Sequence, residues 1–160
     1  MLLMTMIRTR GGRNSTAIEG TEQVLLGQAE FRRILAQERE RSDRNSHGFS
    51  LVLFRVASLD ESAFERFLRL LARRCRRLDV LGWFDSAQVG VLLTDAPAGG
   101  ARRFCNDLKK GLADAKIGNV RLRLFTYGFD PAEPRTEPSI ASDQRPVERR
   151  SNADARPSAG

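Results

Sequence analysis

The sequence predicts an α+β domain in which an antiparallel, palm-type sheet carries helices on one face. Apolar runs of strand length alternate with segments whose apolar residues recur at helical spacing. Two consecutive strands are separated only by a short polar turn. The resulting order is α-βαββαβ, and two βαβ units joined through a hairpin give the ferredoxin-like arrangement, here with an extra N-terminal helix.

The first two elements follow from their apolar patterns. Residues 22–44 are predicted to form the N-terminal helix, because apolar side chains recur about one turn apart between Val24 and Leu35. Residues 49–56 then form a nearly continuous apolar run, which is typical of a strand buried on both faces.

The second helix has the clearest periodicity in the chain. We predict that it spans residues 59–77 and that Ser58 and Glu61 form a capping box at its start. Its inner face is apolar at helical spacing. That face consists of Phe64, Phe67, Leu68, Leu71, Cys75 and Leu78.

Residues 79–84 and 88–93 are predicted to be two strands joined by the turn Asp85-Ser86-Ala87. Asp95 and Pro97 open the next helix. The predicted inner face of that helix consists of Ala101, Phe104, Cys105, Leu108 and Leu112. The final strand is predicted from Val120 to Phe129.

Both ends of the chain are predicted to be disordered, so that residues 21–130 form the one folded domain. Residues 1–20 show no apolar period, and residues 131–160 contain five of the six prolines. Segments with so few large apolar side chains cannot bury enough surface to offset their ordering entropy.

Composition excludes several classes of protein. No apolar run approaches the ~20 residues of a membrane-spanning helix, and no signal peptide is recognisable. Two cysteines and one histidine are too few for a disulfide framework and argue against a structural zinc site. We therefore expect a reduced, cytoplasmic protein without a bound metal or cofactor.

The charge of the chain is basic and lies in the predicted domain. The formal net charge is +7, and residues 21–130 account for +5 of it, with 19 basic and 14 acidic side chains. A basic surface favours an anionic partner such as nucleic acid, a nucleotide or membrane headgroups, although an arginine-rich chain also gains solubility.

Around the predicted hairpin the sequence resembles the GGDEF family of diguanylate cyclases. Asp79 and Phe84 match an aspartate and an aromatic residue that precede the family motif, and an apolar strand follows it. Five residues occupy the motif positions themselves. They are Asp85, Ser86, Ala87, Gln88 and Val89. The resemblance covers roughly residues 24–129 and implies the same ferredoxin-like fold.

The departures from the family pattern predict that the chain is not an enzyme. In the family, carboxylates on the first strand and the hairpin hold two metal ions, and the first-strand position is Arg55 here. The acidic pair of the hairpin is replaced by Ala87 and Gln88, and the paired glycines by Asp85 and Ser86. A fixed cation at a metal position repels a metal ion.

One functional motif of the family is matched here in residue type and position. The family binds cyclic di-GMP at an allosteric RxxD motif before the hairpin, and Arg76-Arg77-Leu78-Asp79 matches it. The resemblance thus implies a cyclic di-GMP site formed by Arg76 and Asp79, with Arg73 as a further contact, in a bacterial signalling or exopolysaccharide system. The local alternative is that Asp79 bounds the strand and that the arginines form a solvated helix end.

Two other functions stay open. The chain is a protein–protein interaction module without a ligand, acting on a partner or as a homodimer, or it is a ferredoxin-like RNA-binding domain. The RNA-binding domain would use Phe125, Tyr127 and Phe129, with Arg121 and Arg123 in phase on the same strand. Packing under the helices explains these aromatic residues better, since the RNA-recognition signature is not present.

Overall fold

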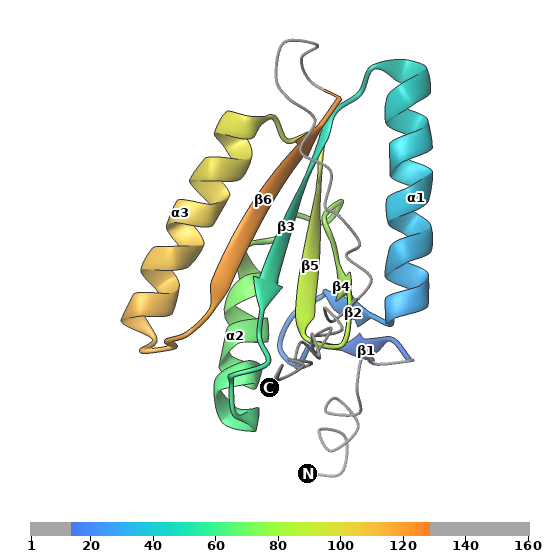
Figure 1. Ribbon diagram of the computed structural model, residues 1–160. Coiled ribbons are helices and arrows are strands. Elements are labelled where there is room, and N and C mark those ends of the chain that lie inside the picture. The colour runs from blue at the N-terminus through green and yellow to red at the C-terminus, as the bar shows by residue number, and fades with distance from the viewer. Residues whose placement is uncertain (1–13, 129–160) are drawn as a thin grey trace, which may run out of the picture.

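A computed structural model of the chain describes residues 14–128. Its strands are β1 (Thr16–Ala17), β2 (Val24–Leu26), β3 (Phe49–Arg55), β4 (Val80–Trp83), β5 (Gln88–Thr94) and β6 (Arg121–Tyr127). Its helices are α1 (Gln28–Asn45), α2 (Glu61–Arg74) and α3 (Ala98–Asp114). All six strands lie in one sheet, in the order β1-β2-β4-β5-β3-β6 (Figure 1).

The predicted ferredoxin-like core is confirmed. Strands β4 and β5 form the hairpin, β3 pairs antiparallel with both β5 and β6, and β6 is an edge strand. The N-terminal segment adds two short strands to the other edge, where β2 runs parallel to β4 and β1 runs antiparallel to β2.

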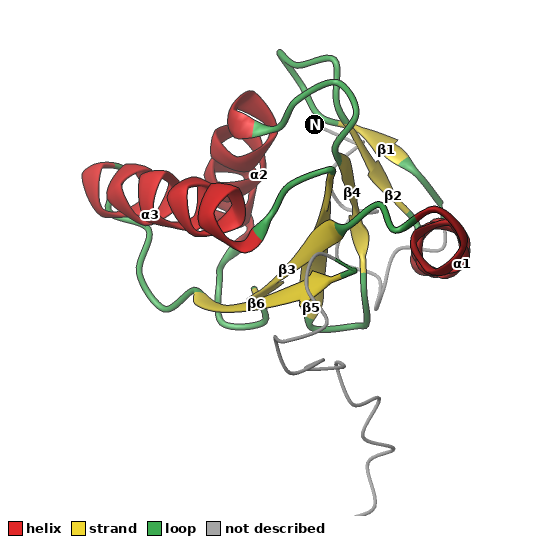
Figure 2. Ribbon diagram, turned by 90° about the horizontal axis from the view of Figure 1, so that it is seen from above, coloured by secondary structure: helices red, strands yellow, loops and turns green. Residues whose placement is uncertain are grey.

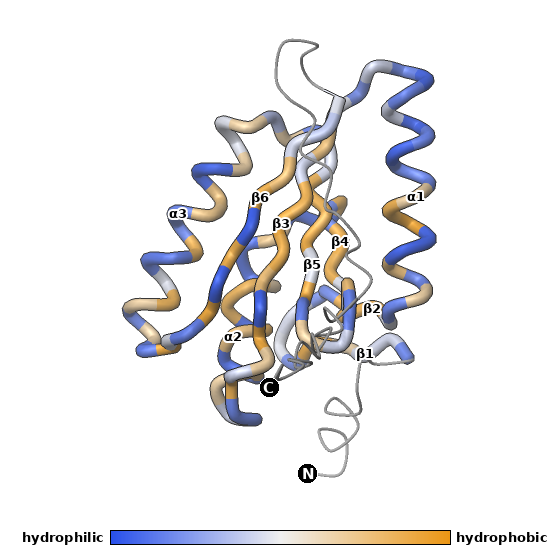
Figure 3. The backbone as a smooth tube through the Cα atoms, in the orientation of Figure 1, coloured by the Kyte–Doolittle hydropathy of each residue, from blue (hydrophilic) through white to orange (hydrophobic). Residues whose placement is uncertain are grey.

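Helices cover both faces of the sheet. Helices α2 and α3 lie on one face, as predicted, whereas α1 lies on the opposite face on the side of β2 and β4 (Figure 2). The alternation of side chains along β3 explains the two cores, because Val52 and Phe54 face α2 and α3 while Leu51 and Leu53 face α1. Hydrophobic colouring runs along all the central strands in Figure 3.

Two strand glycines hold α1 against the sheet. The ring of Phe31 on α1 is fully buried and rests on Gly82 of β4 and Gly90 of β5. A β-carbon at Gly82 would lie 2.5–2.6 Å from three atoms of Phe31, and one at Gly90 would lie 2.7 Å from two ring atoms. The missing side chains therefore create the space that the ring occupies.

Three local predictions are wrong. Leu78, predicted on the inner face of the second helix, is 73% exposed and lies beyond the end of α2. Residues 24–26 form strand β2 rather than the first turn of a helix, because the backbone of Leu25 and Leu26 pairs with β4. The cap of α2 is Asp60, whose carboxylate accepts a hydrogen bond from the Ala63 N–H at 2.8 Å. Ser58 instead donates its hydroxyl to the carbonyl of Asn119.

The folded part begins earlier than residue 21. Thr16 and Ala17 pair with β2, and Ile18 is 5% exposed within the core under α2 and α3. Residues 1–13 and the predicted tail at 131–160 lie outside the described residues, as does Phe129. Within residues 14–128, no helix is long and apolar enough to span a membrane.

Candidate functional site

The segment Arg76–Asp79 is a tight turn between α2 and β4. The N–H of Asp79 donates to the carbonyl of Arg76, and the carboxylate of Asp79 accepts from the N–H of Arg76 at 2.6 Å. The side chain of Gln23 donates to the same Arg76 carbonyl, and Thr94 donates its hydroxyl to the carbonyl of Leu78. Gln23, just before β2, and Thr94, at the end of β5, thus both hydrogen-bond the turn.

Asp79 is part of this turn rather than of a solvent-facing site. It is 6% exposed, whereas Arg76 is exposed, so the expectation that both side chains face solvent is wrong for Asp79. Burial raises the pKa of the Asp79 carboxyl, although backbone donation from Arg76 and Thr94 and the Arg76 guanidinium oppose that rise. Arg73 is exposed on the last turn of α2.

Replacing Asp79 by Ala is expected to lower the free energy of unfolding by about 1–3 kcal/mol, because the part-buried N–H of Arg76 loses its acceptor. Replacing Arg76 by Ala is expected to change it by less than about 0.5 kcal/mol, since the Arg76 side chain is exposed. Urea denaturation of the two variants measures the difference. Equal effects would contradict the structural role of Asp79.

The contribution of the Asp79 carboxyl to the free energy of unfolding changes with pH in a definite direction. Because the folded state raises the pKa of Asp79 above its ordinary 3.8, the folded state holds that proton more tightly than the unfolded state. This carboxyl therefore adds stability below pH 3.8 that is lost as the pH rises through the folded-state pKa. Asp79→Ala removes that contribution, so its stability deficit is expected to be largest in acid.

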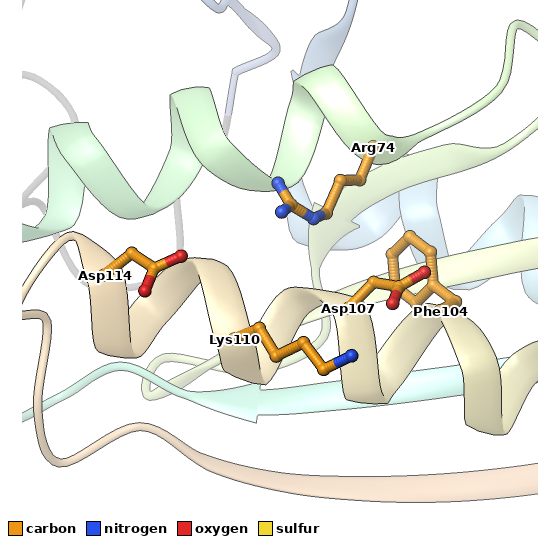
Figure 4. A pocket seen from close by; sticks show the side chains of 5 residues that line it. All are labelled: Arg74, Phe104, Asp107, Lys110 and Asp114. Carbon is orange, nitrogen blue, oxygen red and sulfur yellow. The ribbon is translucent and has the colours of Figure 1, made fainter.

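A cavity of about 440 Å³ opens between α2 and α3, near this turn but separate from its predicted ligand residues (Figure 4). Its lining consists of Arg74, Phe104, Asp107, Lys110 and Asp114. Gly111 leaves room for Arg74, since a β-carbon there would lie 2.8 Å from an Arg74 nitrogen. Two cations and two carboxylates balance the charge, and the lining does not include Arg73, Arg76 or Asp79.

The hairpin predicted at the GGDEF-like positions is confirmed, and its polar groups satisfy one another. The Asp85 carboxylate accepts from the N–H of Ala87 and from the side-chain amide of Gln88. Ser86 is exposed at the tip, and Val89 is fully buried in the core. The one carboxylate of the hairpin is thus already hydrogen-bonded within its own turn.

Cations occupy the end of the sheet beside this hairpin. Arg55, at the end of β3, lies directly opposite Gln88 on β5 and directly opposite Arg121 on β6. Arg32 on α1 also reaches the hairpin, where its Nε donates to the carbonyl of Phe84. Within residues 14–128, no group of three or more His, Cys, Asp or Glu side chains is arranged to hold a metal ion.

Sequence reasoning did not pair Arg121 with Arg55. The two residues lie 66 positions apart, and only the register of β3 against β6 brings them together. The two strands were predicted, but the pair follows from them only when the register of their pairing is known.

Neither cysteine has the character of a reactive thiolate. Burial, followed by the charge of Asp79, raises the pKa of Cys75, and burial raises the pKa of Cys105 against the opposing charge of Lys109. Both thiols therefore stay protonated at neutral pH, as expected for core-packing cysteines.

The fold is of the ferredoxin-like type, and a solved structure shares it. The crystal structure of a DGC protein from Thermotoga maritima is similar to this chain with a TM-score of 0.54 and 15% sequence identity. The match covers 62% of this chain and 79% of that one. No protein-family model matches the sequence, and no curated protein matches it either. The likeness therefore establishes the fold.

Proposed function

We propose that the chain is a non-catalytic GGDEF-like domain that acts by binding a protein partner in signalling. The observation that carries the non-catalytic part of this proposal is the direct pairing of Arg55 with Arg121 at the end of the sheet, beside a hairpin whose carboxylate is already hydrogen-bonded. Two guanidinium groups at this place would repel the divalent metal ions that GTP chemistry needs. DGC abbreviates diguanylate cyclase, so the similar structure supports the GGDEF-like part of the proposal.

Purified protein incubated with GTP and magnesium is expected to give no cyclic dinucleotide above background. A DGC protein with an intact carboxylate set, assayed in parallel, is the positive control. Replacing Arg55 by Asp is not expected to create activity, because the hairpin still lacks its acidic pair at Ala87 and Gln88. Turnover by the unmodified chain would overturn the non-catalytic assignment.

The geometry favours a protein-binding role over a cyclic di-GMP receptor. A receptor of the RxxD kind needs a carboxylate free to accept hydrogen bonds from guanine, and the Asp79 carboxylate is buried and bonded to the Arg76 N–H. Arg76 and Arg73 are exposed, but the Asp79 carboxylate that the motif pairs with them is not free to bind a ligand. A link to bacterial exopolysaccharide regulation follows from the family resemblance alone.

Isothermal titration with cyclic di-GMP separates the two roles. We expect no heat of binding at high micromolar ligand. Binding that Arg76→Ala abolishes and that Arg33→Ala, on the exposed side of α1, leaves intact would establish the receptor role instead.

A further inference from the structure

One part of the sheet surface is strongly cationic, and no helix among residues 14–128 lies over it. Arg55, Arg121 and Arg123 are exposed and project from the same face of β3 and β6. In Figure 3 the hydrophilic stretches of these two strands lie side by side at one end of the sheet. Helix α1 lies on the same face toward β2 and β4 (Figure 2), and its Arg39 reaches the Tyr127 end of β6, away from Arg121 and Arg123. We call Arg55, Arg121 and Arg123 the arginine shelf.

The shelf is electrostatically unfavourable for the isolated domain. Arg55 and Arg121 are direct cross-strand partners, and like charges in that position destabilise a sheet. Arg123 follows two residues along β6, about 7 Å further on. Among residues 14–128, none of the three forms an ion pair, and the nearest hairpin carboxylate, Asp85, is hydrogen-bonded to Ala87 and Gln88. A bound anion would relieve this repulsion.

The same face changes from cationic to aromatic along β6. Phe125 and Tyr127 follow Arg123 in phase and are half-buried. Tyr127 stacks on Phe49 at 5.2 Å between ring centroids, and the Arg39 guanidinium lies 5.9 Å from the Tyr127 centroid. Both Phe125 and Tyr127 pack partly against the hydrophobic cluster under α1, but among the described residues Phe125 stacks on no other ring.

We propose that the arginine shelf binds the phosphate backbone of a single-stranded nucleic acid, with Phe125 as a stacking contact. A row of cations followed by an aromatic ring on one strand is the arrangement that suits an extended polyanion whose bases can stack. Helix α1 lies on the same face of the sheet, toward β2 and β4 (Figure 2). This binding site goes beyond the protein-binding role, and neither depends on the other.

The test measures binding of a labelled oligo-uridine of about 15 nucleotides by fluorescence anisotropy at several salt concentrations. Three phosphate contacts predict that log K falls with log salt with a slope of about −2. The variant Arg55→Gln/Arg121→Gln/Arg123→Gln is expected to bind roughly 100-fold more weakly at 0.1 M salt, with a slope near zero.

A charge-matched control distinguishes binding at the arginine shelf from non-specific attraction between the basic domain and the oligonucleotide. The variant Arg33→Gln/Arg41→Gln/Arg44→Gln removes the same charge from the exposed side of α1 and is expected to keep the wild-type slope. Equal weakening of both variants, no binding by the wild type at 50 mM salt, or binding to phosphatidylserine vesicles without oligonucleotide binding would each overturn the proposal.

A second measurement does not depend on the triple variant. Arg121→Gln alone should raise the melting temperature slightly, because it removes the repulsion with Arg55, and should weaken oligonucleotide binding about fivefold at 0.1 M salt. Unchanged binding by this folded single variant would also overturn the proposal.

Discussion

Replacing Phe31 by Ala is expected to lower the free energy of unfolding by about 3–5 kcal/mol, the largest single-residue effect that we anticipate. The ring is fully buried and fills the space above Gly82 and Gly90. Its loss leaves a cavity that two glycines cannot fill, and it removes the main anchor of α1. Equilibrium denaturation in urea, followed by the fluorescence of Trp83, measures the change.

The matched control for this prediction is the same substitution at Phe104, which is only half-buried on α3. We expect Phe104→Ala to cost clearly less, since that residue is already partly exposed to solvent. A loss below about 1 kcal/mol for Phe31→Ala would contradict the anchoring role, because such a small value is typical of surface positions.

Replacing Gly82 by Ala is expected to destabilise the fold by about 1–3 kcal/mol, although alanine usually suits a strand better than glycine. The new β-carbon would meet Cβ, Cγ and Cδ2 of Phe31 at 2.5–2.6 Å. These atoms lie near the backbone of α1, so the helix must move. Gly90→Ala meets only the far edge of the ring and should cost less.

The double variant Phe31→Ala/Gly82→Ala tests the mechanism directly. If the clash with the ring is the cause, Gly82→Ala costs little or nothing once the ring is absent, and a double-mutant cycle shows a coupling energy of about the size of the clash. Independent, additive effects would show that Gly82 acts through the strand backbone instead.

The central part of the fold was predictable because its signals are local. The nearly continuous apolar run of β3 and the periodicity of α2 depend on neighbours within a few positions, and the structure has both elements close to the predicted bounds. The hairpin turn at Asp85 was also predictable, because its carboxylate bonds within the turn itself.

The errors occur where a distant segment decides the local structure. Val24–Leu26 has apolar residues that also fit a helix, and only the edge of β4 makes a strand of it. Similarly, the burial of Asp79 depends on donors and neighbours from β5, which the RxxD spacing does not reveal. The charge of the arginine shelf was visible in the composition, but its position required the register of β3 and β6.

The parallel pairing of β2 with β4 has a consequence for how the chain assembles. Strand β2 precedes α1, β3 and α2 in sequence, yet its partner follows all three, so the pairing closes a long loop. Hairpin β4–β5, by contrast, closes over four residues and can form within microseconds. Loop-closure entropy therefore places the docking of the N-terminal strands late in folding, after the hairpin and β3 have built the edge that receives them.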